Sequence, residues 1–166
     1  MVQKRWTILS VVALIIAFAV LVGGFLFIKN MTTNKKAEQL TPSKITAQII
    51  SAMNYTDLSE VSESQLAKHY DIPDGVISDS SVYMSKSSDS ASELSCFLLA
   101  DSSKFHLLQT SIMNHINLKA TGFKNLNPAQ YTLLKNCLIT QNGKYVLVCV
   151  DSNSATEAKL FNDMFQ

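Results

Sequence analysis

The chain has 166 residues, with 14 basic and 13 acidic side chains, three cysteines and five glycines. Residues 1–42 carry five basic side chains and one acidic one, whereas residues 43–166 carry nine lysines and twelve acids, a net charge of −3. A mildly acidic C-terminal part is atypical of nucleic-acid binders and of polybasic membrane-surface modules. Two of the five glycines, Gly23 and Gly24, lie in an apolar segment, so a glycine-rich phosphate loop is not predicted.

The first element in chain order is the apolar segment 7–28, which has 22 residues and no charged side chain. As a helix it would be roughly 33 Å long, enough to cross a hydrocarbon core of about 30 Å. A water-soluble helix of this length is rarely apolar on every face. Trp6 precedes the segment, where an interfacial aromatic residue belongs. We therefore predict a transmembrane helix at 7–28 that contacts the lipid bilayer.

The flanks of this segment predict its topology. Ala17-Phe18-Ala19 resembles a signal-peptidase site, but the apolar run continues past it, so we expect an uncleaved signal anchor. Basic residues flank the segment on both sides. We place the short basic tail 1–6 in the cytoplasm, because such a tail usually stays inside, and residues 29–42 form a polar spacer. The expected location is the cell membrane, single-pass, with the C-terminal domain 43–166 outside.

The predicted domain begins with helices and continues with strands. Thr41-Pro42 supplies an N-cap and a first-turn proline for a helix at about 43–53. Ser62 and Gln65 form a capping-box pattern that predicts a short helix at 63–70. Two strands follow, at Ser80–Ser85 and Glu93–Ala100, and the apolar run CFLLA in the second is typical of a strand covered on both faces. The serine-rich stretch 85–95 is predicted to be a flexible connection, with glycan or wall contact as the alternative.

The second half repeats this order. Asp101-Ser102-Ser103 caps a helix that runs to about Ala120, with Gly122 as its C-terminal glycine. PAQYTLLK, residues 128–135, predicts a short helix. Asn142-Gly143 separates the β-rich runs NCLIT and KYVLVCV, which predicts a hairpin with a type I′ turn. A second capping-box pattern, Ser154 with Glu157, begins a closing helix. The fold class is thus α+β, an N-terminal transmembrane helix followed by one small antiparallel-sheet domain with helices packed on it.

The stretch YTLLKNCLITQNGKYVLVCVDSNSATEAKLF resembles the C-terminal signature of a domain-of-unknown-function family. That family comprises anchored or lipoprotein-type extracytoplasmic proteins of Gram-positive, clostridia-like bacteria. The matching positions are Tyr131, Gly143, Tyr145, Val146, Asp151 and Phe161. LAKHYDI and ASELSCFLLADSSKF also fit, so the resemblance covers roughly 45–165. Many relatives carry a lipid-anchoring cysteine where this chain has its apolar segment. The resemblance implies export and a fold, and supplies no activity.

Cys96, Cys137 and Cys149 are an odd number for a domain placed outside the cytoplasm. With a two-residue Asn142-Gly143 loop, Ile139 pairs with Val146 and Cys137 with Val148, so Cys149 points to the opposite face. A three-residue loop would instead place Cys137 and Cys149 opposite each other. Cys96 could reach either one only from an adjacent strand. We interpret all three as small buried hydrophobic residues, with a disulfide or a reactive thiol as alternatives.

The histidines and a group of three acids are the remaining candidates for chemistry. His69, His106 and His115 lack metal-binding spacing. The acids Asp57, Glu60 and Glu63 are interpreted as solvated helix-start residues, with paired-carboxylate catalysis as the alternative. No G-x-S-x-G elbow or S-x-x-K motif occurs in its proper context. We therefore assign no catalytic, cofactor-binding or metal-binding residue and no cofactor. The tyrosines are expected to be half-buried, and any that gather on one exposed patch would mark a partner site: Tyr55, Tyr70, Tyr83, Tyr131 and Tyr145.

The functional expectation is a single-pass, outward-facing module without catalysis. It would bind or scaffold an envelope protein or a wall component at the cell envelope. One alternative is an envelope hydrolase with an unrecognised active site, and another is an anchored regulator that faces the cytoplasm.

Overall fold

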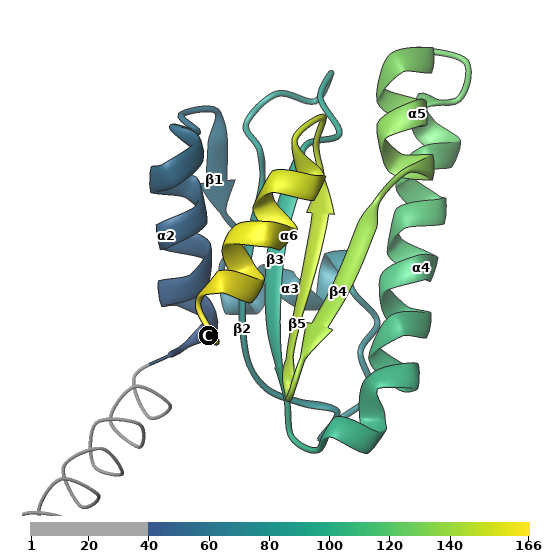
Figure 1. Cartoon of the computed structure of the whole chain (residues 1–166). Helices are drawn as coiled ribbons and strands as arrows, with labels where there is room; N and C mark the ends of the chain where they lie inside the picture. Colours follow the sequence, from purple (N-terminus) through teal and green to yellow (C-terminus); the bar gives the residue numbers. More distant parts are fainter. Residues whose placement is uncertain (1–39) are drawn as a thin grey trace, which may run out of the picture. The chain divides into compact units, whose positions relative to one another are not determined.

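Residues 40–166 are described by the structure, a computed structural model (Figure 1). The predicted tail at 1–6, the membrane span at 7–28 and the spacer up to residue 39 lie outside the described residues. Within residues 40–166, no helix is both long and apolar enough to cross a membrane. Residues 41–166 form one compact unit, and the predicted α+β class with an antiparallel sheet is confirmed for it.

The sheet has five strands in the order β1-β2-β3-β5-β4, and all neighbours are antiparallel. The strands are β1 (Leu58–Glu60), β2 (Ile77–Ser85), β3 (Glu93–Leu99), β4 (Leu138–Asn142) and β5 (Tyr145–Val150). The central strands β3 and β5 are almost entirely buried, as the apolar run CFLLA predicts. β1 was not predicted, because three residues of which only Leu58 is half-buried carry no readable periodicity.

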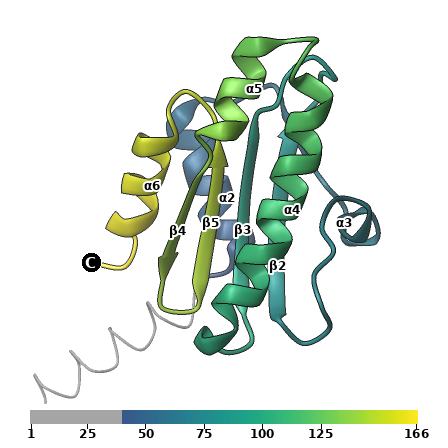
Figure 2. The ribbon, with the colours of Figure 1, turned by 90° about the vertical axis from the view of Figure 1, so that its right-hand side faces the viewer.

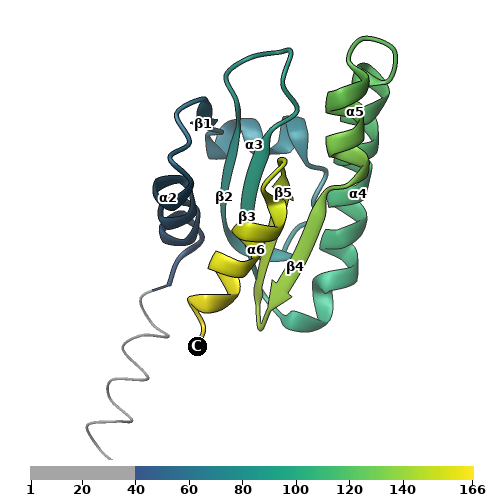
Figure 3. The same cartoon turned by 45° about the horizontal axis from the view of Figure 1, so that its top comes forward.

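Helices cover both faces of the sheet. They are α2 (Pro42–Met53), α3 (Glu63–His69), α4 (Phe105–Phe123), α5 (Pro128–Lys135) and α6 (Ser154–Asp163), with a 3₁₀ turn η1 (Ser102–Lys104) before α4. Figure 2 shows α4 in front of the sheet, α2 behind it and α6 at the left, and Figure 3 shows α3 behind β2 and β3. All five helices were predicted, and Thr41 caps α2 as expected, since its Oγ1 accepts from the Lys44 amide.

Strand alternation divides the interior into two layers. On one side, the apolar stripe of α4 packs on inward side chains of the central strands: Leu108, Ile112 and Ile116 against Phe97, Val146, Val148 and Val150. On the other side, α2 and α6 contact the remaining set of strand side chains, which includes Leu94, Leu147 and Cys149. Because side chains of successive strand residues point to opposite faces, a polar residue in β3 or β5 belongs to one layer or the other.

The β4–β5 hairpin has a different register from the predicted one. Asn142 pairs with Tyr145 and Ile139 with Val148, so the loop is Gly143-Lys144 rather than Asn142-Gly143. Only Gly143 has a positive φ in this loop, +58°, which fits a type II′ rather than a type I′ turn. The register moves by two residues, so each side chain keeps the face that was predicted for it.

Three capping predictions were wrong. The Ser62 side chain makes no cap bond to an amide of α3 and contacts the Ser64 hydroxyl at 3.1 Å instead. The side chain of Glu157 contacts Tyr55 rather than the start of α6. Gly122 lies inside α4, which continues to Phe123 and ends where the Asn127 amide bonds the Phe123 carbonyl, one residue before Pro128 begins α5.

Candidate functional site

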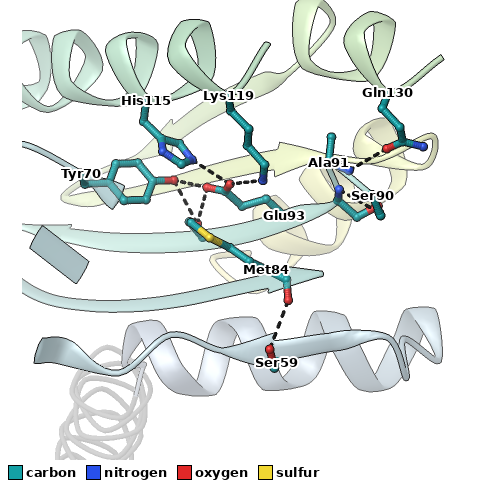
Figure 4. Close-up of polar contacts among 11 residues, drawn as sticks. Ser59, Tyr70, Met84, Ser90, Ala91, Glu93, His115, Lys119 and Gln130 are labelled. Atoms are coloured by element: carbon teal, nitrogen blue, oxygen red, sulfur yellow. Dashed lines mark hydrogen bonds and ion pairs between the residues drawn. The ribbon is translucent and has the colours of Figure 1, made fainter. Parts of the chain in front are cut away.

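The first polar cluster lies between β3 and α4, around the carboxylate of Glu93 (Figure 4). Glu93 is the first residue of β3 and is 1% exposed. Its Oε2 accepts hydrogen bonds from His115 Nε2 at 2.8 Å and from Lys119 Nζ at 2.9 Å. His115 and Lys119 are four residues apart on α4, so both side chains point toward the same end of β3.

Two hydroxyl groups complete the shell of Glu93. The Tyr70 hydroxyl and the Ser95 hydroxyl both donate to Oε1, so each carboxylate oxygen has two donors. The Tyr70 ring lies against the His115 ring, with centroids 4.3 Å apart. The cluster therefore joins the end of α3, the start of β3 and the middle of α4 through a single buried carboxylate.

The protonation states of this cluster follow from these contacts. Burial alone would raise the pKa of Glu93, but the hydrogen bond from His115 and the charge of Lys119 outweigh it and lower the pKa to about 2. Burial raises the pKa of Tyr70 well above its ordinary value. At neutral pH Glu93 is thus a stable carboxylate and Tyr70 a neutral phenol. Neither has the pKa near 7 that favours a general acid or base.

The second polar cluster lies on the opposite face of the sheet. The Tyr55 hydroxyl is 2.7 Å from Glu157 Oε1 and 3.0 Å from Asp151 Oδ1. These contacts join the segment after α2, the end of β5 and the first turns of α6. A phenol has one proton, so Tyr55 can donate to only one of the two carboxylates at a time.

Glu157 differs from Glu93 in the hydrogen bonding of one of its carboxylate oxygens. Glu157 is 1% exposed, and its Oε2 has no hydrogen-bond partner among residues 40–166. The Cys149 thiol lies close to this carboxylate, but a thiol is too weak a donor to satisfy it. Burial raises the pKa of Glu157, and the Asp151 charge adds to this effect, whereas the Tyr55 hydrogen bond opposes it without cancelling it.

A small cavity of about 70 Å³ adjoins this cluster, lined by Tyr55, Asp57, Leu58, Ser92, Glu93, Asp151 and Glu157. Its size suits a few water molecules, which are the ordinary occupants of small polar cavities. Within the described residues, no group of three histidine, cysteine or acidic side chains is arranged to hold a metal ion.

The third feature is a groove of about 460 Å³ between α3 and β2. It is lined by residues 60–63, Leu66 and residues 77–82. β1 pairs with β2 only through Leu58–Glu60 opposite Tyr83–Ser85, and the chain then turns away into α3. In the part of the chain that the structure describes, the first half of β2 has no strand on this side.

The acidic cluster predicted around the start of α3 is split by the fold. Glu60 and Glu63 line the groove, whereas Asp57 lines the small cavity beside Tyr55. Glu60 and Glu63 are both exposed, which agrees with solvated side chains. The three acids are therefore not assembled into one carboxylate site.

The cysteines are free thiols, two buried and one half-buried. β3 neighbours β5, so the strand of Cys96 is adjacent to that of Cys149, but Leu94 rather than Cys96 is opposite Cys149. Cys137 belongs to the α4 side of the sheet and Cys149 to the other, as alternation predicts. Burial raises the pKa of all three thiols, which disfavours reactive thiolates.

The histidines and tyrosines are distributed over both layers. His69 at the end of α3 approaches His115, with ring centroids 6.3 Å apart, while His106 contacts the Ser103 carbonyl at the start of α4. Tyr70 and Tyr131 lie on the α4 side, whereas Tyr145 packs against Phe165 of the C-terminal segment. Tyr83, like Tyr145, is half-buried.

Sequence reasoning missed the Glu93 and Glu157 clusters. Glu93 is an acid at the head of a strand that was itself predicted to be buried, and a buried acid requires partners. His115 and Lys119, four residues apart on a predicted helix, were available as those partners. Glu157 was misassigned to a helix cap, and nothing in the sequence links it to Tyr55.

The fold defines a class, an α+β domain whose antiparallel sheet lies between helices. In the described residues this domain has a buried ion network on one face of the sheet and an edge of β2 that β1 covers only in part. Residues 51–151 match the family described as Domain of unknown function (DUF4358), and the chain belongs to this family. No curated protein and no solved structure matches the chain. The predicted membership in a domain-of-unknown-function family is thus confirmed, while the Gram-positive and lipoprotein-type context stays a prediction.

Proposed function

We propose that the chain is a membrane-anchored, outward-facing binding module without catalysis, and that it holds its partner in the groove between α3 and β2. The observation that carries this proposal is the groove itself, whose volume of about 460 Å³ falls in the range of ligand sites. Its lining combines apolar side chains with exposed acids and strand backbone, which are the parts that a binding surface needs.

The Glu93 cluster offers less support for a hydrolase. A hydrolase needs a nucleophile beside a base at a cavity that admits substrate. The serine hydroxyl that contacts Glu93 is that of Ser95, which is 0% exposed and already donates to Glu93. This cluster is better explained as a structural network than as catalytic machinery.

Site-specific photo-crosslinking in intact cells tests the groove. The full chain would carry p-benzoylphenylalanine in place of Ser78, an exposed groove residue, or in place of Thr132, an exposed residue of α5 that serves as control. A discrete adduct is expected from position 78 and not from position 132. Equal adducts from both positions, or none from position 78, would contradict the proposal.

Topology is tested separately by protease treatment of the same cells. If residues 43–166 face outward, shaving removes the domain from intact cells as completely as from lysed cells. A domain that is cleaved only after lysis would favour the cytoplasmically facing regulator.

A further inference from the structure

We propose that the groove receives an extended basic peptide segment, which adds to the free edge of β2 as a further antiparallel or parallel strand. This inference rests on the binding function proposed above and names the class of partner. Strand addition to an exposed sheet edge is a recurring mode of peptide recognition, in which main-chain hydrogen bonds supply affinity and alternate side chains supply specificity.

The backbone of Ser80 is the first part of this docking edge. The Val61 amide donates to the Val82 carbonyl at 2.8 Å, so the backbone groups of Val82 face the β1 side of the strand. In an antiparallel sheet these directions alternate, so Ser80 faces the same side. β1 has ended before it reaches Ser80, and the N–H and C=O of Ser80 therefore face the groove.

The side chain of Asp79 already accepts a hydrogen bond from the backbone N–H that a guest strand would use. The Ser80 N–H donates to Asp79 Oδ1 at 2.8 Å, at a point where the β2–β3 register shifts between Ile77 and Asp79. When a guest strand enters, its carbonyl replaces the aspartate on this N–H. The displaced carboxylate is then free to pair with a cationic side chain of the guest, so one residue both covers the edge and selects the partner.

The charge of the groove specifies a basic occupant. Glu60, Glu63 and Asp79 line it and are exposed, and none of the described residues that line it is basic. Its apolar lining consists of Val61, Leu66, Ile77 and Val82. Because side chains alternate along a strand, a guest would place every second side chain on this apolar lining and direct the others toward the acids. Five residues of β2, 77–81, offer an edge of roughly 16 Å.

The same charges disfavour a second copy of this chain as the occupant. Pairing the β2 edges of two copies would bring both sets of Glu60, Glu63 and Asp79 together. Like charges that face each other across paired strands are destabilising, and charged edges commonly protect sheets from self-association. The same acidic side chains would instead attract a basic segment.

Fluorescence anisotropy with the full chain in detergent micelles tests the proposal. The probe is a labelled hexapeptide of alternating lysine and valine, compared with alternating glutamate and valine and with a lysine–valine peptide that is N-methylated on alternate backbone nitrogens. Saturable binding of the first peptide is expected, weakening as salt rises. The acidic and the N-methylated peptides should bind at least roughly tenfold more weakly, because they lose charge pairing or main-chain hydrogen bonds.

Matched proline variants locate the binding edge. Ser80→Pro removes the N–H at the free edge of β2, and Gln141→Pro removes an N–H at the free edge of β4 on the opposite side of the sheet. Roughly tenfold weaker binding is expected for Ser80→Pro and unchanged binding for Gln141→Pro. The triple variant Glu60→Gln, Glu63→Gln, Asp79→Asn changes only exposed side chains and should abolish the salt dependence even if a proline variant fails to fold.

The outcomes separate this inference from the proposed function. A groove crosslink in cells, together with no binding of the lysine–valine peptide, overturns the basic-strand partner and leaves the binding module intact. Equal binding of the N-methylated peptide overturns strand addition. Self-association in sedimentation that Ser80→Pro abolishes would assign the edge to a second copy and also overturn the inference.

Discussion

Glu93 and Glu157 lie on opposite faces of the same sheet, and each is 1% exposed. Glu93 has four donors on two oxygens, whereas in the described part of the chain Glu157 has the Tyr55 hydroxyl on one oxygen and no partner on the other. Accordingly, folding lowers the pKa of Glu93 and raises that of Glu157. Equal burial therefore does not decide the protonation state of a carboxylate. The donors and charges around it decide it.

The difference also separates two structural roles. The Glu93 network is fully satisfied and ties β3 to α4, so it should behave as a rigid part of the core. Glu157 is only partly satisfied beside a small cavity, which makes it a position where the fold loses free energy at neutral pH. Substitutions in the Glu93 network should therefore cost more stability than substitutions around Glu157.

Glu93→Ala should have the largest effect, a loss on the order of 3–5 kcal/mol in the free energy of unfolding, because it leaves His115, Lys119 and Tyr70 without their common acceptor. Urea unfolding of the full chain in micelles at pH 7 measures it. Glu63→Ala, at an exposed position on α3, is the control and should change stability by less than about 0.5 kcal/mol. A Glu93→Ala effect as small as that of the control would show that the network is not structural.

The pH dependence of stability should reflect the lowered pKa of Glu93. The contribution of Glu93 is fully present above its unfolded pKa of roughly 4.3 and is lost as the pH falls through the folded value of about 2. The shift corresponds to a loss on the order of 3 kcal/mol across this window. Chemical unfolding at pH 5, 4, 3 and 2 measures it, and the Glu93→Gln variant should lack this part of the decline. Identical slopes in both proteins would exclude Glu93 as its source.

Two tyrosine variants compare the clusters directly. Tyr70→Phe removes a donor to the ionised Glu93 and should cost about 2 kcal/mol. Tyr55→Phe changes a half-buried tyrosine and should cost about 1 kcal/mol. Both changes remove a single hydroxyl, so the difference reports the environment rather than the size of the deletion. Denaturant midpoints at pH 7 provide the measurement. The reverse order would refute the ranking of the two clusters.

Glu157→Gln should have an effect no larger than that of Tyr55→Phe, and of the opposite sign. Because folding raises the pKa of Glu157, its protonated form stabilises the fold below the unfolded pKa, and this stabilisation is lost as the pH rises through the folded value. A neutral amide avoids the loss, so a gain of about 1 kcal/mol is expected at pH 8 and almost none at pH 4. Glu93→Gln, the same substitution in the other cluster, should instead destabilise at both pH 8 and pH 7. A loss for Glu157→Gln at pH 8 would show that its charge is needed.

Much of the fold was readable from local patterns. Thr41-Pro42 at the start of α2 and Asn127-Pro128 at the start of α5 mark helix ends through backbone chemistry that acts within a few residues. The apolar run in β3 and the hairpin signal at Gly143 are equally local. The register error arose because Gly143 tolerates a positive φ at either loop position, and tertiary pairing selected the first.

The polar clusters were beyond such patterns. Tyr55 and Glu157 are 102 residues apart, and Tyr70 and Glu93 come from different elements, so no spacing rule connects them. The open edge of β2 was hidden for a related reason, since β1 is too short to be recognised and its early end creates the groove.

Local interactions along the chain therefore specify which segments become helices or strands and which side chains face inward, because capping, turn geometry and apolar periodicity act over a few residues. They do not specify which buried polar groups meet. The pairing of Glu93 with His115 and Lys119, the isolation of one oxygen of Glu157 and the uncovered edge of β2 all depend on the order of strands and the packing of helices on them, and these are set by contacts between residues far apart in sequence.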